Sequence, residues 1–193
     1  MPQHRRRLVL LASRFGKIDL IPPLYDEEHY ITVRDAIGHL QPIEAGEICI
    51  NDSLHRSSAL SEINMERIRQ SVPGGTWRDW DENLKLRCHR KASGATFPSV
   101  YGRMEWDRPS PTMTTQFYGY GNGRFGHPEQ DRAISLREGA ILQSFPEDYI
   151  FADEQHPVKK RELGTHIGNA VPVELGRAIG ISIQEHLKKM EVN

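Results

Sequence analysis

The sequence predicts an α/β protein with regular elements near both ends and a loop-rich middle. The apolar run at residues 8–12 is typical of a buried strand. Residues 173–190 repeat apolar side chains at helical spacing and carry lysines in the last turns, where they suit the helix dipole. Residues 73–125 contain "PGG", "SGATFPS", "DRPSPT" and "YGYGNGRFG", which are all turn signals.

The first half of the chain predicts two helices after a proline-containing loop at residues 17–30. Residues 32–40 place Val33, Ile37 and Leu40 on one helical face, and Thr32 is positioned to cap the first turn. Residues 59–71 predict a second helix.

The second half predicts a helix at residues 135–145. Ser135 and Glu138 have the spacing of a capping box, and Pro146 ends the helix because it cannot continue the backbone hydrogen bonds. Residues 156–163 are interpreted as a polar connector between this helix and the C-terminal one.

Charge and hydropathy indicate whether the sequence fits a polyanion-binding, a secreted or a membrane-spanning protein. The net charge is −1, but residues 51–125 hold eleven Lys/Arg against eight Asp/Glu, an excess typical of either a solvated surface or a face that binds polyanions. The basic opening is followed by only five apolar residues, which is short for a secretory signal. No stretch approaches the ~20 apolar residues of a membrane span. We therefore expect a soluble, cytoplasmic protein with no membrane partner.

The two cysteines, Cys49 and Cys88, do not form a CxxC pair, and the histidines lack the spacing of metal ligands, so no metal site is predicted. Cys49 between two isoleucines is interpreted as a core residue. Cys88 in a basic stretch is more often structural than nucleophilic. "GNGRFG" fits the dinucleotide fingerprint, but Pro128 follows closely, which favours a loop over a cofactor site.

The opening "PQHRRR" carries chemistry. In an extended segment Gln3, Arg5 and Arg7 project from one face. Two guanidinium groups and an amide on one face can hold a phosphate or a base edge, although a basic strand end in water remains the alternative.

Four stretches in order resemble the carboxy-terminal half of DNA cytosine-5 methyltransferases. They are "PQHRRRLVLLAS", "RMEWDRPSPTMTTQF", "HPEQDRAISLREGAILQSFPEDYIF" and "HIGNAVPVELGRAIG". The resemblance covers essentially the whole chain. It implies a fragment of a Rossmann-like catalytic domain with a loop-rich target-recognition domain: residues 1–30 and 166–193 in the catalytic part, and residues 31–165 with hinge helices in the recognition part.

The resemblance also implies a covalent mechanism, in which a Pro-Cys thiolate adds to a flipped cytosine and S-adenosylmethionine donates the methyl group. Neither Cys49 nor Cys88 follows a proline, and no glycine loop for the methyl donor is present. We therefore expect this chain to methylate DNA only together with a catalytic partner chain.

Individual roles follow from the same resemblance. Arg7 would reach the flipped base, with Gln3 and Arg5 ordering the segment. The "GNAVP" turn would close over S-adenosylmethionine. Arg103 would read guanine, Thr112 and Thr114 would contact phosphates, and the glycine-rich loop would approach double-stranded DNA. Arg137 and Glu138 would be structural. The residues so assigned to the cofactor are Gly168, Asn169, Ala170 and Val171, and those assigned to DNA are Arg103, Thr112, Thr114, Gly121 and Arg124.

Several interpretations stay open at this point. The chain could be the recognition subunit of a two-chain enzyme, a fragment of a single-chain enzyme, a stand-alone DNA-binding module or a structural scaffold. A missing catalytic half would leave apolar side chains uncovered, and we expect these to include Leu8, Leu10, Ile179 and Ile183.

Overall fold

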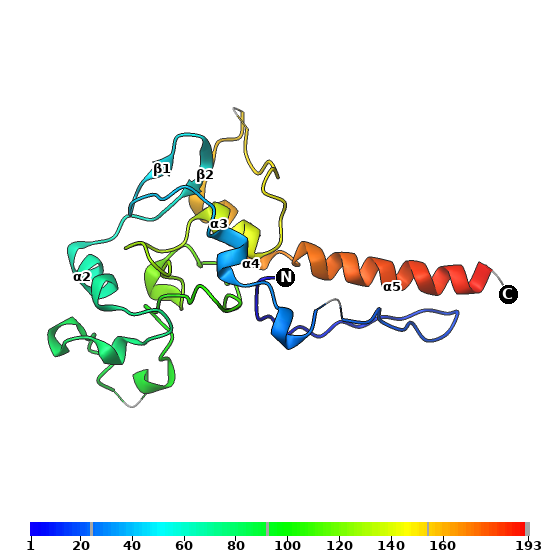
Figure 1. The fold of residues 1–193 in the computed structure, drawn as a ribbon, viewed down its shortest axis with the longest axis horizontal. Coiled ribbons are helices and arrows are strands. Elements are labelled where there is room, and N and C mark those ends of the chain that lie inside the picture. Colours follow the sequence, from blue (N-terminus) through cyan, green and yellow to red (C-terminus); the bar gives the residue numbers. More distant parts are fainter. Residues whose placement is uncertain (24, 92, 154, 192–193) are drawn as a thin grey trace.

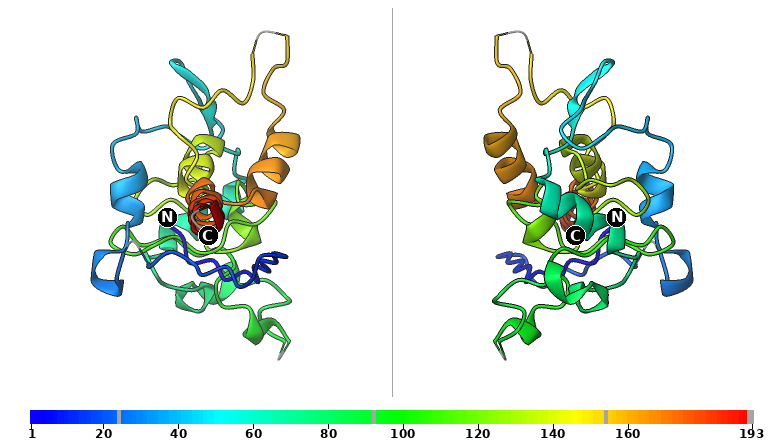
Figure 2. Two further views of the ribbon diagram at one scale, coloured as in Figure 1. Left: turned by 90° about the vertical axis from the view of Figure 1, so that its right-hand side faces the viewer. Right: turned by 90° about the vertical axis from the view of Figure 1, so that its left-hand side faces the viewer.

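The computed structural model describes residues 1–23, 25–91, 93–153 and 155–191. It consists of a rounded body and an elongated projection (Figure 1). The projection pairs the long C-terminal helix with an extended N-terminal arm, residues 6–23 and 25–30, that runs out alongside this helix and back. The two end-on views in Figure 2 place both parts of the projection on the same side of the body.

The elements confirm a mixed α/β protein, although helix and irregular backbone dominate. One antiparallel hairpin carries a bulge beside Ile48, and several one-turn 3-10 helices connect the larger elements. The helices are α1 (Val33–Ile37), α2 (Glu62–Gln70), α3 (Leu136–Leu142), α4 (Lys160–Asn169) and α5 (Val173–Glu191), and the strands are β1 (Ile48–Cys49) and β2 (Asp52–Arg56). The hairpin was not predicted from the sequence.

Helix starts that depend on local side chains lie where the sequence predicts them. The Thr32 hydroxyl accepts the Asp35 amide, and the Asp35 carboxylate accepts the Thr32 amide. The same reciprocal capping box joins Ser135 and Glu138 at the start of α3. Each box satisfies amide donors that the first helical turn leaves unpaired. The long C-terminal helix is also confirmed as α5.

The core of the body forms around α3. Phe117 is fully buried and packs directly on this helix, because a Cβ placed on Gly139 would lie 2.0 Å from the Phe117 ring. Only glycine permits so close an approach. The other fully buried apolar side chains of this cluster are Val33, Met104, Ile134, Leu136, Ala140 and Leu142.

The prediction of a polar connector before α5 is wrong over residues 160–163, which form the first turn of α4. The sequence hid this helix because Gly164 and Gly168 disfavour helix formation. Both glycines are explained by packing. A Cβ atom would lie 2.2 Å from the Tyr118 ring at the first position and 2.2 Å from the Thr114 carbonyl oxygen at the second. Tertiary contact therefore selects a helix that local propensity does not.

The prediction of a buried strand at residues 8–12 is also wrong for this chain. These residues form no strand, and the side chains of Leu8 and Leu10 are 96% and 87% exposed. The physical reason is that a strand requires a neighbouring strand to pair with, and none lies beside this segment in the described residues. The expected exposure of Leu8, Leu10 and Ile183 is confirmed, whereas Ile179 is half-buried.

The arm rests on α5 through polar contacts. The Ile21 amide donates to the Ser182 hydroxyl at 3.0 Å, and the His186 ring nitrogen Nε2 lies 2.9 Å from the Ser13 hydroxyl.

The boundary expected between residues 165 and 166 falls inside α4, so that the projection begins only at α5. The last two residues of the expected C-terminal segment, 192–193, lie outside the described residues.

Candidate functional site

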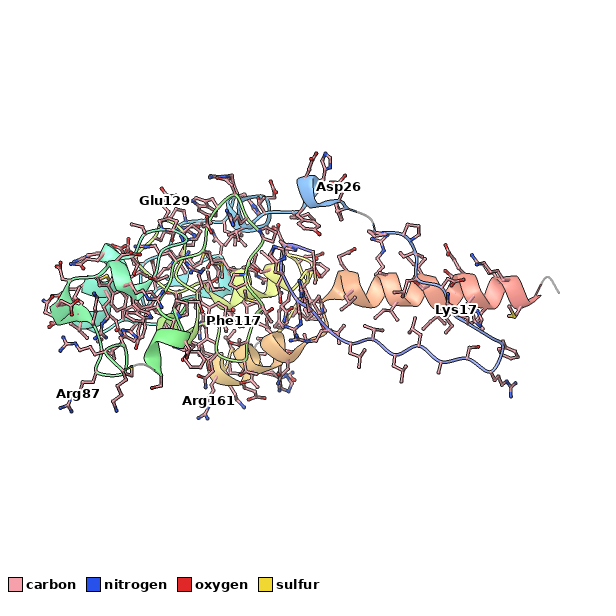
Figure 3. All side chains as sticks on the ribbon, turned by 90° about the horizontal axis from the view of Figure 1, so that it is seen from below. Lys17, Asp26, Arg87, Phe117, Glu129 and Arg161 are labelled. Atoms are coloured by element: carbon pink, nitrogen blue, oxygen red, sulfur yellow. The ribbon has the colours of Figure 1, made fainter. Side chains whose placement is uncertain are left out.

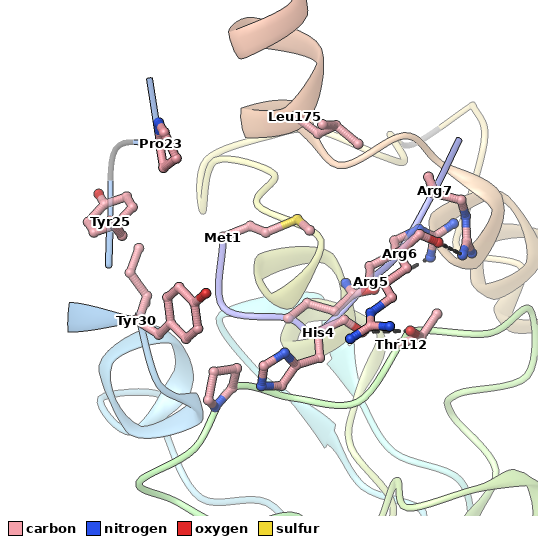
Figure 4. A pocket seen from close by; sticks show the side chains of 13 residues that line it. Met1, His4, Arg5, Arg6, Arg7, Pro23, Tyr25, Tyr30, Thr112 and Leu175 are labelled. Carbon is pink, nitrogen blue, oxygen red and sulfur yellow. Dashed lines mark hydrogen bonds between the residues drawn. The ribbon is translucent and has the colours of Figure 1, made fainter. Parts of the chain in front are cut away.

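A large pocket lies where the N-terminal segment joins the body. Its volume is about 950 Å³, and Figure 4 shows arginines on one side facing aromatic and apolar side chains on the other. The cationic side comes from residues 5–7, and the apolar side comes from the returning arm and the start of α5. The lining residues are Met1, Gln3, His4, Arg5, Arg6, Arg7, Pro23, Tyr25, Tyr30, Ile31, Pro109, Thr112 and Leu175.

Gln3 fixes the floor of this pocket. Its amide nitrogen donates to the Leu142 carbonyl at 3.2 Å and to the Gln143 side-chain oxygen at 3.0 Å. Its amide oxygen accepts the Met113 main-chain N–H at 3.0 Å. The side chain is buried, and every one of these partners lies more than a hundred residues away. Gln3 therefore orders the segment, as the resemblance implies.

The two arginines that share a face with Gln3 behave differently. Arg5 is half-buried and donates to the Met113 carbonyl at 3.0 Å, and its buried Nε finds no partner among the described residues. Burial, with a smaller contribution from Arg7, lowers the pKa of Arg5 below its ordinary value. Arg7 is exposed, and its guanidinium donates to the Arg6 carbonyl at 2.7 Å. Its remaining donors face the pocket and solvent (Figure 4).

Of the threonines expected to contact phosphates, Thr112 lines the pocket and Thr114 does not. The Thr112 hydroxyl donates to the His4 carbonyl at 2.6 Å and lines the pocket. Thr114 is exposed close to it in the chain, and its carbonyl packs against Gly168 of α4. Both hydroxyls retain lone pairs or donors for a ligand, so that their assignment to phosphates stays a prediction.

The turn assigned to the cofactor links α4 to α5. Gly168 and Asn169 end α4, and the Ala170 amide caps it by donating to the His166 carbonyl at 2.9 Å. Gln143 holds the turn by donating to the Ile167 carbonyl at 2.7 Å. Val171 follows and is 64% exposed. The turn thus presents Asn169 and Val171 outward, and its assignment to the cofactor stays a prediction.

The interpretation of Arg103 as a base-reading residue is not supported by its position. The side chain is 5% exposed. Its guanidinium donates to the carbonyls of Ile68, Ser71, His127 and Gln130 and forms an ion pair with the Asp131 carboxylate. Arginine has five N–H donors, and carbonyls and a carboxylate of the protein use them here. In this structure Arg103 therefore joins α2 to residues 127–131 and cannot reach DNA.

Arg124 and Gly121 were also assigned to DNA, and both contact other parts of the protein instead. Arg124 donates to the Gly75 carbonyl at 2.6 Å, and burial lowers the pKa of its guanidinium. Gly121 packs against the Tyr101 ring, where a Cβ would lie 2.9 Å from it. The glycine-rich stretch contains one 3-10 turn, Tyr120–Asn122, and no helix opens at Gly126.

Neither cysteine belongs to the pocket. Cys49 is buried in the hairpin, as expected, and its thiol lies 3.5 Å from the Gln41 side-chain oxygen. Cys88 is exposed in a different part of the body and does not line the pocket. The described residues therefore bring no thiolate to the arginine pocket.

A buried ion pair beneath α3 was only partly foreseen. Glu138 receives two hydrogen bonds of 2.7 Å from the Arg132 guanidinium, in addition to its capping bond from Ser135. Although burial opposes the charged form, these bonds and the charge of Arg132 bring the pKa of Glu138 to about 2. Arg137 pairs with Asp52 of β2 at 2.5 Å. The structural roles expected for Glu138 and Arg137 are confirmed, whereas Arg132 carries no sequence signal of its burial.

Comparison with known proteins decides the family. Residues 1–185 match the family of C-5 cytosine-specific DNA methylases. The chain belongs to this family. It is 56% identical over 188 residues to the type II methylase M.HgiDII of Herpetosiphon aurantiacus, and it is 31% identical over 197 residues to the type II methyltransferase M.Eco47II of Escherichia coli. It is also 35% identical over 182 residues to DNA (cytosine-5)-methyltransferase 3 of Arabidopsis thaliana.

Coverage is one-sided in all three comparisons. The matches cover 97%, 98% and 81% of this chain but 53%, 44% and 13% of the respective relatives. The chain thus spans about half the length of its two type II relatives or less. Over the residues that the structure describes, no helix combines the length and apolarity needed to cross a membrane.

Proposed function

We propose that these residues form the DNA-recognising part of a cytosine-5 DNA methyltransferase, and that the nucleophilic thiolate comes from a catalytic part with a Pro-Cys motif. The proposal rests on the observation that the structure places the arginine pocket and the two cysteines in different parts of the molecule. The family's arginine face and "GNAVP" turn are ordered, but both cysteines lie outside the pocket. The part of the chain at residues 31–165 would recognise the target, and the two ends would complete the catalytic domain.

In such an enzyme, side chains of this chain would bind the extruded cytosine and hold it in position. Gln3 and Arg5 hold the backbone of the segment through buried hydrogen bonds, so that Arg7 presents free guanidinium donors to an acceptor on an extruded cytosine. Thr112 closes the rim next to it. S-adenosylmethionine would supply the methyl group, and the exposed Asn169 and Val171 would cover one edge of it.

The catalytic part can be supplied experimentally from a relative. We would co-express this chain with the part of the Herpetosiphon methylase that lies outside the matched region, as separate polypeptides, in a host without cytosine-5 methylation. Bisulfite sequencing of the host DNA should show methylation at one sequence in the co-expressing strain and none with either chain alone. Methylation by this chain alone would refute the need for a partner, and its absence in both arms would favour a stand-alone DNA-binding module.

The pocket arginine offers a second test in the reconstituted enzyme. Arg7→Ala should lower the methylation rate and leave the preferred sequence unchanged, because its proposed contact is to the extruded base present at every productive site. Arg14→Ala removes the same charge from the exposed arm and serves as the control. Turnover on a library of single-base site variants measures both properties. An altered sequence preference in Arg7→Ala would move this residue from catalysis to recognition.

A further inference from the structure

A second cationic feature lies in the body, outside the pocket. We call it the basic loop and define it as residues 85–91, with the sequence "KLRCHRK". Residues 85–100 hold four Lys/Arg and no Asp/Glu, which concentrates the mild basic excess of the middle region in one place. Arg87 marks the loop in Figure 3, at the end of the body away from the projection.

The loop is held by an aromatic cluster rather than by long secondary structure. The ring of His89 stacks on Trp77 with centroids 4.2 Å apart and an interplanar angle of 15°. Trp77 also donates its indole N–H to the Phe97 carbonyl at 3.1 Å, so that one side chain contacts both His89 and Phe97. At the start of the loop, Arg67 of α2 donates to the Leu84 carbonyl at 2.9 Å. These contacts fix the backbone from which the charged side chains project.

His89 contributes packing and not charge. Its Nδ1 accepts the Leu86 amide at 3.4 Å, which leaves the proton on Nε2. Burial, together with the nearby Arg67 guanidinium, lowers the pKa of His89 below its ordinary value. A neutral imidazole can therefore stack on Trp77 and accept a hydrogen bond at neutral pH, while the neighbouring cations stay in water.

Three charged side chains on the loop remain available to a ligand. Arg87, Arg90 and Lys91 are exposed, and among the described residues none of them pairs with a carboxylate, although Arg90 donates to the Glu82 main-chain carbonyl at 2.7 Å. Lys85 is largely covered and pairs with Glu82 at 2.7 Å.

The nearby acidic groups are already engaged. Asp79 caps the turn at Thr76, and Asp81 accepts from the Gln70 side chain at 2.7 Å. These two carboxylates bond to neutral groups and keep their charge, but they lie outside the loop, where every ionised side chain is positive. The buried aromatic cluster fixes the backbone of the loop, from which unpaired arginine and lysine side chains project. Because this backbone is already ordered, little conformational entropy is lost when an extended polyanion binds.

We propose that the basic loop binds the sugar-phosphate backbone of double-stranded DNA, with Arg87 and Lys91 as the principal phosphate contacts. This inference rests on the proposed function, since it assumes that the chain works on DNA. Phe97, whose main-chain carbonyl accepts from the same tryptophan, exposes 65% of its surface and offers an aromatic ring in the same region of the chain. Arg87 and Lys91 replace Arg103, which is buried, and Arg124, which is half-buried, as the cationic DNA contacts of the recognition part.

Salt dependence tests phosphate contacts directly. The full chain would be titrated with a fluorescein-labelled duplex of mixed sequence at several salt concentrations. Each phosphate contact contributes about 0.9 to the slope of log affinity against log salt concentration, so Arg87→Ala/Lys91→Ala should reduce that slope by about 2. Lys160→Ala/Arg161→Ala, at the start of α4, removes two charges elsewhere and should leave the slope unchanged. Thermal unfolding of both variants checks that the fold is kept.

The outcomes separate this inference from the proposed function. An unchanged slope in the loop variant, with normal binding by the wild type, overturns the inference and leaves the methylation result standing. A changed sequence preference without a change in slope also overturns it, because the loop would then read bases. No binding of duplex by the wild-type chain removes the inference, and the co-expression experiment then decides separately whether the chain serves a methyltransferase.

Discussion

The body encloses a core of apolar side chains, whereas the projection leaves several of its apolar side chains exposed. In the body, α3 packs against Phe117 and carries Glu138, which forms a buried ion pair with Arg132. In the projection, α5 touches little beyond a single extended arm, and Leu187 together with Leu8 and Leu10 stays exposed. The body therefore has its own core, whereas the projection exposes the type of surface that marks an interface or an aggregation hazard.

This difference teaches that the two parts obey different rules for substitution. In the body, side chains are packed tightly enough that one added methyl group or one removed charge must be accommodated by the surroundings. On α5 the same change meets solvent. Predictions that compare matched substitutions in the two parts therefore test whether the contrast holds in solution.

The largest effect should come from the buried ion pair. Glu138→Gln removes the carboxylate that Arg132 contacts twice and leaves a buried cation without its partner, which typically costs about 3–5 kcal/mol of unfolding free energy. On α5, Glu174→Gln breaks an exposed pair with Arg177 at 3.7 Å and should cost no more than about 1 kcal/mol. Urea denaturation of both variants measures the difference. Equal effects would mean that the body is as loosely packed as the surface.

The same region should respond to pH. Burial lowers the pKa of His127 from 6.5 to about 4, so that between these two values the unfolded chain binds the proton more readily than the folded one. Stability from this group is therefore complete above pH 6.5 and is lost as the pH falls towards 4. Glu138, whose pKa is lowered from 4.5 to about 2, adds a further loss from about pH 4.5 downward.

A variant isolates the histidine. The His127 Nδ1 accepts the amides of Glu129 and Gln130 at 3.1 and 2.9 Å, and Asn offers an oxygen acceptor that does not titrate. His127→Asn should flatten the dependence of unfolding free energy on pH between about 6.5 and 4.5, measured by urea denaturation at a series of pH values. A wild-type curve that is already flat there would show that His127 is not buried neutral in solution.

The smallest effects, of opposite sign, should come from glycines in the two parts. Gly168→Ala places a methyl group 2.2 Å from the Thr114 carbonyl oxygen and should destabilise the body by about 1–3 kcal/mol. Gly180→Ala on α5 meets no atom within 4 Å and should stabilise that helix by about 0.5–1 kcal/mol. Chemical denaturation checks the first, and helical circular dichroism during heating checks the second. A loss of stability in Gly180→Ala would reveal that α5 is covered in solution.

Local signals explain what the sequence could predict. The capping boxes at Thr32 and Ser135 and the periodicity of α5 depend on residues within a turn or two of each other, so they can be recognised without the fold. The ordering role of Gln3 also came from the sequence, through its family resemblance. Where the partners are near in the chain, or the motif is shared by a family, the prediction needs no tertiary information.

The predictions that were wrong concern residues whose deciding partners are distant in the chain. The strand expected at residues 8–12 needs a neighbouring strand, and α4 needs Tyr118 and Thr114 to accommodate its glycines. Arg103 carries the same side chain whether it faces a base or, as here, four carbonyls from distant segments. The basic stretch around Cys88 is visible in the sequence, but its role as a separate cationic surface depends on which of its side chains the fold leaves exposed and without an ion-pair partner.

The hydrogen bonds of Gln3 carry a consequence for the order of events during synthesis. Its partners at Met113, Leu142 and Gln143 leave the ribosome more than a hundred residues after it does. At ordinary elongation rates of about 5–20 residues per second, the N-terminal segment waits on the order of ten seconds before it can dock. Throughout that interval Gln3 lacks its partners, so the arginine pocket can form only after Gln143 has left the ribosome.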